Sequence, residues 1–66
     1  MNVTINGEQQ TLAAETSIDR LIEQLGLQGK RLAVEVNLEI VPRSDYDRRV
    51  LAEGDAIEIV QAIGGG

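Results

Sequence analysis

The chain has 66 residues and a net charge of −5, from 6 basic and 11 acidic residues, and it contains no cysteine and no histidine. This length allows one domain without disulfides or a Cys-based zinc site, and the acidic balance disfavours nucleic acid while favouring a basic partner surface. Without His or Cys, the usual general base, thiol nucleophile and metal ligands are missing, so neither an active site nor a bound metal is expected.

The chain opens with a pattern typical of a β-hairpin. Residues 2–6 alternate between polar and apolar side chains, which indicates a strand with one solvated face. Asn6-Gly7 follows, the strongest short hairpin signal, because a type I′ turn needs two residues that tolerate positive φ. A returning strand is therefore expected over residues 9–13, with Leu12 turned inward.

A helix is predicted next. Thr16 has the character of an N-cap, with Asp19 three positions later in place of the Glu or Gln of a capping box. Gly26 is placed to end the helix in the left-handed conformation, with Leu27 folding back as the accompanying apolar contact. Between these ends, an apolar stripe with helical spacing is formed by Ile18, Leu21, Ile22 and Leu25.

Three further strands are expected in the second half. Residues 32–36 alternate, with the apolar side chains inward. Residues 39–41 form a short strand ended by a proline, which cannot donate to a β-ladder. The last strand is predicted over residues 56–63, with Ile57 and Ile59 facing the core.

The residues between these last two strands are mostly polar. A loop with room for one helical turn is expected over residues 43–49. Tyr46 is the only aromatic residue, so it either closes the edge of the core or anchors an interface. Asp45 and Asp47 lack the glycine-centred pattern and the further ligands of a calcium loop, so no metal site is predicted there.

The predicted order of elements indicates an α+β fold. A hairpin, one amphipathic helix and further strands are typical of a mixed sheet of about five strands with the helix covering one face. This layout resembles the β-grasp (ubiquitin-like) roll. The domain is expected to span residues 1–63, followed by a flexible Gly-Gly-Gly tail at residues 64–66.

The sequence also indicates where the protein resides. No apolar run approaches the length of a membrane span. The first residues, Met1 to Thr4, lack the basic region and apolar stretch of a signal peptide. A soluble, cytoplasmic protein is therefore expected.

The glycine tail is the feature that carries chemistry. Gly64, Gly65 and Gly66 have no Cβ and, when extended, reach roughly 10 Å, so they can thread a narrow channel. The terminal carboxylate of Gly66 is a poor electrophile and must become a mixed anhydride, such as an acyl-adenylate, before a sulfur or nitrogen nucleophile attacks. A frayed end or an expression remnant is the alternative, but a run that directly follows an apolar strand favours a functional tail.

The sequence resembles the thiamine-pathway sulfur carrier family, which is ubiquitin-like, over essentially its whole length. The resemblance rests on the glycine ending, on Ile-Val-Pro-Arg at residues 40–43, on Glu-Gly-Asp-Ala-Ile-Glu-Ile-Val at residues 53–60, and on the helix start at residues 16–21. It implies that a ubiquitin-activating-type enzyme adenylates Gly66 with ATP. Sulfur, drawn from cysteine through a desulfurase, then converts the adenylate to a thiocarboxylate, and thiazole synthase takes up that sulfur. On this resemblance the protein is a carrier that binds no cofactor itself.

Other functions share the same terminal chemistry. The small sulfur-carrier subunit of molybdopterin synthase often has a proline-rich stretch before its glycines, and it tends to be longer and richer in aromatics. Here that stretch is Gln61-Ala62-Ile63, without proline, so the thiamine pathway is preferred. A ubiquitin-like protein modifier would instead join Gly66 to a lysine of a target protein. A plain β-grasp binding module would tolerate loss of the last glycine.

A partner interface is predicted beside the tail. Alternation along the last strand places Val60 and Ala62 on the face opposite the core, where they are apolar at positions that are normally polar. Thr4 is expected on the same face, on a neighbouring strand. Ile63 and Arg43 complete the predicted interface. A lone exposed valine and a solvated arginine are the ordinary alternatives.

Overall fold

The computed structural model of the protein describes residues 1–62. The expected tail at residues 64–66 and the predicted domain end at Ile63 lie outside the described residues. The chain order is β1 (Asn2–Ile5), β2 (Glu8–Thr11), α1 (Ile18–Gln24), β3 (Leu32–Val36), β4 (Glu39–Val41), the 3₁₀ helix η1 (Arg43–Asp45) and β5 (Ala56–Gln61).

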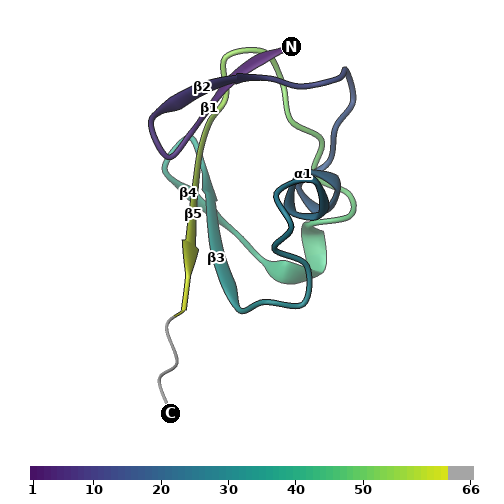
Figure 1. Ribbon diagram of the computed structural model, residues 1–66, viewed down its shortest axis with the longest axis vertical. Helices are drawn as coiled ribbons and strands as arrows, with labels where there is room; N and C mark the ends of the chain where they lie inside the picture. Colours follow the sequence, from purple (N-terminus) through teal and green to yellow (C-terminus); the bar gives the residue numbers. More distant parts are fainter. Residues whose placement is uncertain (63–66) are drawn as a thin grey trace.

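The five strands form one mixed sheet in the order β2-β1-β5-β3-β4. β5 is central, parallel to β1 and antiparallel to β3, while β1–β2 and β3–β4 are antiparallel pairs. Figure 1 shows α1 on one side of this sheet. The α+β architecture with one helix over a mixed sheet confirms the fold expected from the sequence.

The core lies between α1 and the facing side of the sheet. Tyr46 belongs to this core with only 8% of its surface exposed, so it closes the core edge and is not an exposed interface anchor. The core cluster consists of Val3, Ile5, Leu12, Ile18, Leu21, Ile22, Val34, Val36, Val41, Tyr46, Leu51, Ile57 and Ile59.

The hairpin turn forms as predicted, but its strands are shorter. Asn6 and Gly7 have φ of 50° and 84°, which are the positive values of a type I′ turn. Because Asn6 takes this conformation, β1 ends one residue earlier than expected. β2 covers Glu8–Thr11, not residues 9–13. Leu12 is buried as predicted, although it lies beyond the strand.

The helix N-cap is one residue later than predicted. Ser17 is extended and its hydroxyl accepts the amide of Arg20, whereas the Thr16 hydroxyl donates to the carbonyl of Ala13 at 2.7 Å. Thr16 is buried and its hydroxyl is engaged away from the helix. The proposed capping box with Asp19 is therefore wrong, because the third residue after the true cap is an arginine.

The helix C-terminus agrees with the prediction except at one position. Gly26 has φ of 72°, its amide donates to Glu23, and the amide of Leu27 donates to Ile22, which together form a Schellman motif. Leu27 packs against the core, as expected. Leu25 was predicted to be buried with the stripe but is exposed, because it is the C-cap of a short helix.

The second half of the chain follows the predicted strands. β3 and β4 have the expected bounds, and Pro42 follows β4. The turn between them places Leu38 at φ of 70°, a strained conformation for a bulky side chain. β5 ends at Gln61, so Ala62 lies just beyond it and Ile63 outside the described residues. Among residues 1–62, no helix has the length and apolarity needed to cross a membrane.

Candidate functional site

β5 is the strand that leads from the core to the glycine end of the sequence. Ile57 and Ile59 are 1% and 8% exposed, which confirms that they face the core. Val60, between them and the chain end, is 63% exposed. Because side chains alternate along a strand, Val60 lies on the sheet face opposite α1, here called the outer face.

The register shows which predicted interface residues share a region of this face. Val60 lies opposite Ala33 of β3, and the amide of Ala62 donates to the carbonyl of Arg31 at 2.9 Å. The side chains of Val60 and Ala62 are both exposed, and both lie near the last described residues of the chain. The predictions for Ile63 and for the glycines Gly64, Gly65 and Gly66 concern residues outside the described part of the chain.

The other two predicted interface residues lie elsewhere. Thr4 is on the outer face, as expected, but it pairs with Ala56, four residues before Val60, which is about 13 Å along the strand. Arg43 lies in η1 and lines a shallow depression with Asp19 of α1, so it is on the helix side of the sheet. The structure thus does not bring Thr4 or Arg43 next to Val60.

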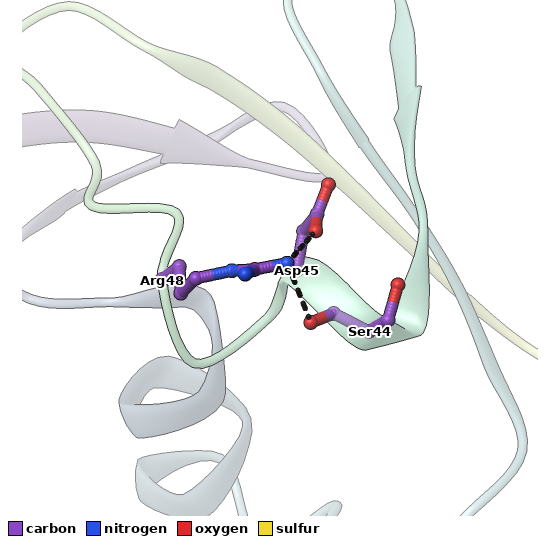
Figure 2. Close-up of polar contacts among 3 residues, drawn as sticks. All are labelled: Ser44, Asp45 and Arg48. Atoms are coloured by element: carbon purple, nitrogen blue, oxygen red, sulfur yellow. Dashed lines mark hydrogen bonds and ion pairs between the residues drawn. The ribbon is translucent and has the colours of Figure 1, made fainter.

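Arg48, in the loop after η1, forms an ion pair with Asp45, three residues earlier in the chain. Figure 2 shows Arg48 donating to a carboxylate oxygen of Asp45 at 2.7 Å and to the carbonyl of Ser44 at 3.5 Å. The hydrogen bond to Asp45, with the negative charges of Asp45 and Asp47, raises the pKa of Arg48 above its ordinary value. The pair is exposed, so it adds little to stability, and it leaves Arg48 less available to a partner.

Sequence reasoning missed part of the outer face. Ile40 is 76% exposed and lies opposite Glu35, which in turn lies opposite Glu58 of β5. The next pair on the outer face, two residues further along β5, is Ala33–Val60. The alternation along β4, where Val41 is buried, could have predicted that Ile40 is exposed. The pairing of β3 with both β4 and β5 could not be predicted from a local pattern.

The exposed residues just described form one small surface that is both apolar and acidic. Apolar side chains flank two carboxylates, Glu35 on β3 and Glu58 on the neighbouring strand β5. No basic residue pairs with either carboxylate within residues 1–62. The surface, here called the acidic-apolar patch, consists of Ala33, Glu35, Ile40, Glu58 and Val60. Such a patch is suited to a partner with matching apolar and basic groups.

Comparison with known proteins gives consistent matches. The model of the ThiS family matches residues 3–66. A protein named sulfur carrier protein ThiS, from Escherichia coli K12, is 32% identical over 66 residues that cover all of both chains. A crystal structure of the thiamine biosynthesis protein ThiS from Geobacter metallireducens superposes with a TM-score of 0.85 at 33% identity, again over all of both chains.

Longer relatives also match. A protein named thiazole synthase from Paramagnetospirillum magneticum is 44% identical over 66 residues, and another of that name from Magnetococcus marinus is 41% identical. The present chain is covered completely in both matches but spans only 20% of either relative's length.

Proposed function

Since the chain belongs to the ThiS family, we propose that it is a sulfur carrier of thiamine biosynthesis whose reactive group is the carboxylate of Gly66. The observation that carries this proposal is the end-to-end match to the carrier from Escherichia coli, supported by the likeness to the Geobacter metallireducens structure. The family match also favours the thiamine pathway over the molybdopterin pathway.

The proposed chemistry takes place on the tail and is performed by other proteins. A ubiquitin-activating-type enzyme binds ATP, and the Gly66 carboxylate attacks its α-phosphate to give an acyl-adenylate and pyrophosphate. A partner protein's persulfide, formed from cysteine by a desulfurase, attacks the acyl carbon and displaces AMP to give an acyl disulfide. A thiol of a partner protein then cleaves the S–S bond, which releases the thiocarboxylate and leaves a disulfide on the partner side. The chain itself supplies neither a general base nor a nucleotide site, in keeping with its lack of His and Cys. We assign it to the cytoplasm, as a carrier and not an enzyme.

The longer relatives support a thiazole synthase as the sulfur acceptor. In the two proteins of that name, a segment similar to this whole chain is part of one polypeptide that is about five times longer. Joining two segments in one chain raises their effective concentration for each other, which is useful when they act in successive steps. Here the same acceptor would be a separate protein or a further part of the same chain.

The acidic-apolar patch is the surface that we assign to these partners. Two of its residues, Glu58 and Val60, lie on β5, the strand that leads to the tail, so an enzyme that receives Gly66 is expected to lie close to Val60. The carboxylates of Glu35 and Glu58 would attract a basic surface and set its orientation, while Val60 and Ile40 supply apolar contact.

The test is the intact mass of the protein purified gently from its native host. We expect a fraction with one oxygen replaced by one sulfur, and its loss when Gly66 is deleted. Thiamine starvation of the host should increase that fraction. If the protein carries no sulfur and is instead found joined to lysines of other proteins, the carrier function is wrong and the modifier function takes its place.

A further inference from the structure

The parallel pairing of β1 with β5 stops before β5 does. Only two register positions join these strands, Thr4 with Ala56 and Ile5 with Ile57. Beyond them, the side chain of Asn6 takes the place of a strand. Its Nδ2 donates to the carbonyl of Ile59 at 3.1 Å, and its Oδ1 accepts the Ile59 amide at 2.8 Å.

The peptide groups of β5 alternate between two sides. The carbonyls of Asp55 and Ile57 accept the amides of Thr4 in β1 and of Asn6 just after it, whereas the Ala62 amide donates to the carbonyl of Arg31, next to β3. Odd-numbered residues of β5 therefore direct their amide and carbonyl toward β1. Gln61 is the next odd position after Ile59, and β1 has no residue left to meet it.

Gln61 thus presents a short open edge in the middle of the sheet. Among residues 1–62, β1 has no register position opposite Gln61, and the alternation directs the Gln61 amide and carbonyl away from β3. In Figure 1, β1 and β2 lie at the upper end of the sheet, while β5 runs on toward the lower end of the view. The edge is bounded on one side by Asn6 and leads on the other toward the glycines.

We propose that this open edge pairs with an extended backbone segment of the adenylating enzyme, as an added strand. The proposal rests on the function proposed above and adds to it how the tail is held. An unpaired amide and carbonyl in line with a strand recognise another peptide backbone and need no particular side chain.

The position of the edge explains what such pairing would achieve. The Asn6 side chain already bonds the amide and carbonyl of Ile59. An added strand therefore cannot pair with Ile59, and its pairing with β5 can begin only at Gln61. Pairing at Gln61 therefore sets the register of the tail, and the five residues that follow reach roughly 17 Å when extended. The Gly66 carboxylate is in this way delivered at a defined distance from the carrier's body.

The other sheet edges are less suited to this role. β4 has three residues and is followed by Pro42, which has no amide to donate. The outer edge of β2 is two strands away from β5. Neither leads directly into the glycines.

The decisive experiment compares two substitutions at one position. Gln61→Pro removes the open amide, whereas Gln61→Ala removes only the side chain. Binding to the adenylating enzyme is measured by calorimetry and folding by thermal melts. We expect Gln61→Pro to weaken binding by about tenfold or more, Gln61→Ala to stay within about twofold of the parent, and both variants to melt close to it. Equal binding by both variants, or equal loss in both, would overturn the proposal.

A measurement on the unmodified protein keeps the test independent of proline's effect on folding. The Gln61 amide should exchange rapidly with solvent in the free protein, whereas that of Ala62, bonded to Arg31, is slower. In the complex with the adenylating enzyme, the Gln61 amide should become protected. Rapid exchange in the complex, or protection that grows with the concentration of the protein alone, contradicts the proposal, since the latter would indicate a second copy.

These outcomes are separable from those of the proposed function. If the Gln61→Pro variant forms its thiocarboxylate normally, the proposed sulfur-carrier function stands and the proposed strand pairing at Gln61 is wrong. If the protein carries no sulfur but an adenylating enzyme protects its Gln61 amide from exchange, strand pairing at Gln61 stands and the sulfur-carrier function is wrong.

Discussion

Glu35 of β3 lies directly opposite Glu58 of β5 on the outer face of the sheet. Like charges at directly opposed positions destabilise a β-sheet by a few tenths of a kcal/mol to about 1 kcal/mol. The pair is central to the acidic-apolar patch, between Ile40 and Val60. A pair that weakens the fold and lies in a proposed docking surface is better explained by binding than by stability.

Removing one of these charges should therefore stabilise the protein and weaken its interactions. We expect Glu58→Gln to raise the free energy of unfolding by about 0.2–1 kcal/mol, measured by urea denaturation. Its affinity for the adenylating enzyme should fall, and the salt dependence of binding should become shallower.

Glu8→Gln is the matched control, because Glu8 is exposed on β2 and the substitution removes the same charge away from the patch. It should leave both quantities nearly unchanged. If Glu8→Gln weakens binding as much as Glu58→Gln, the effect comes from net charge and not from the patch.

The two faces of β5 should respond oppositely to a new carboxylate. Val60→Asp should leave folding nearly unchanged, because Val60 is exposed, and should weaken binding to the adenylating enzyme and to thiazole synthase. Ile59→Asp should unfold the domain, because it buries an unpaired charge. Thermal melts and binding titrations on both variants test this assignment.

Thr4→Asp measures how far the docking surface extends. Thr4 is on the same face but pairs with Ala56, so we expect a smaller loss of binding than for Val60→Asp. If Val60→Asp folds and binds like the parent, the surface lies elsewhere. A larger loss for Thr4→Asp would move its centre toward β1.

Asn6 should contribute to stability through its side chain. Asn6→Gly keeps the positive φ of 50° accessible but removes both hydrogen bonds to Ile59. Leaving that amide and carbonyl unpaired should lower the free energy of unfolding by about 1–3 kcal/mol. Asn6→Asp retains an oxygen that can accept the Ile59 amide, so its free energy of unfolding should fall by less. Denaturant titrations that find no change for Asn6→Gly would show that the backbone of Ile59 has other partners.

Gly26 should be required for its conformation and not for space. A Cβ built on Gly26 meets nothing within 4 Å, so a substitution there is opposed only by the φ of 72°. Gly26→Ala should cost about 1–2 kcal/mol of stability, and Gly26→Asn less, because asparagine tolerates the left-handed region better. Equal stability of all three proteins by thermal melting would contradict a Schellman motif at this helix end.

The Gly66 carboxylate should be the one group on which sulfur transfer depends. Deleting Gly66, or adding one residue after it, should abolish transfer in a reconstituted assay. The melting temperature should stay unchanged, because the last core residue within residues 1–62 is Ile59, seven positions before Gly66. Normal thiamine-independent growth with the extended chain as sole carrier, once trimming of the extension is ruled out by mass, would contradict the proposed chemistry.

Local signals in the sequence determined the elements of this protein. Asn6-Gly7 specified a turn because its conformation depends on those two residues alone, and Gly26 ended the helix for the same reason. Alternation identified Ile57 and Ile59 as core residues, since a strand directs successive side chains to opposite faces. The fold class could therefore be inferred without coordinates, whereas the proposal that Gly66 is the reactive residue rests on the sequence alone and stays a prediction.

The tertiary structure decided whatever depends on which strands are neighbours. The pairing of Glu35 with Glu58 and the bonds of Asn6 to Ile59 join residues far apart in sequence, so no local pattern encodes them. The helix cap moved from Thr16 to Ser17 because the Thr16 hydroxyl bonds the carbonyl of Ala13 within the folded loop. The open edge at Gln61 exists only because β1 is shorter than β5 where the two strands pair, and strand pairing is a property of the assembled sheet.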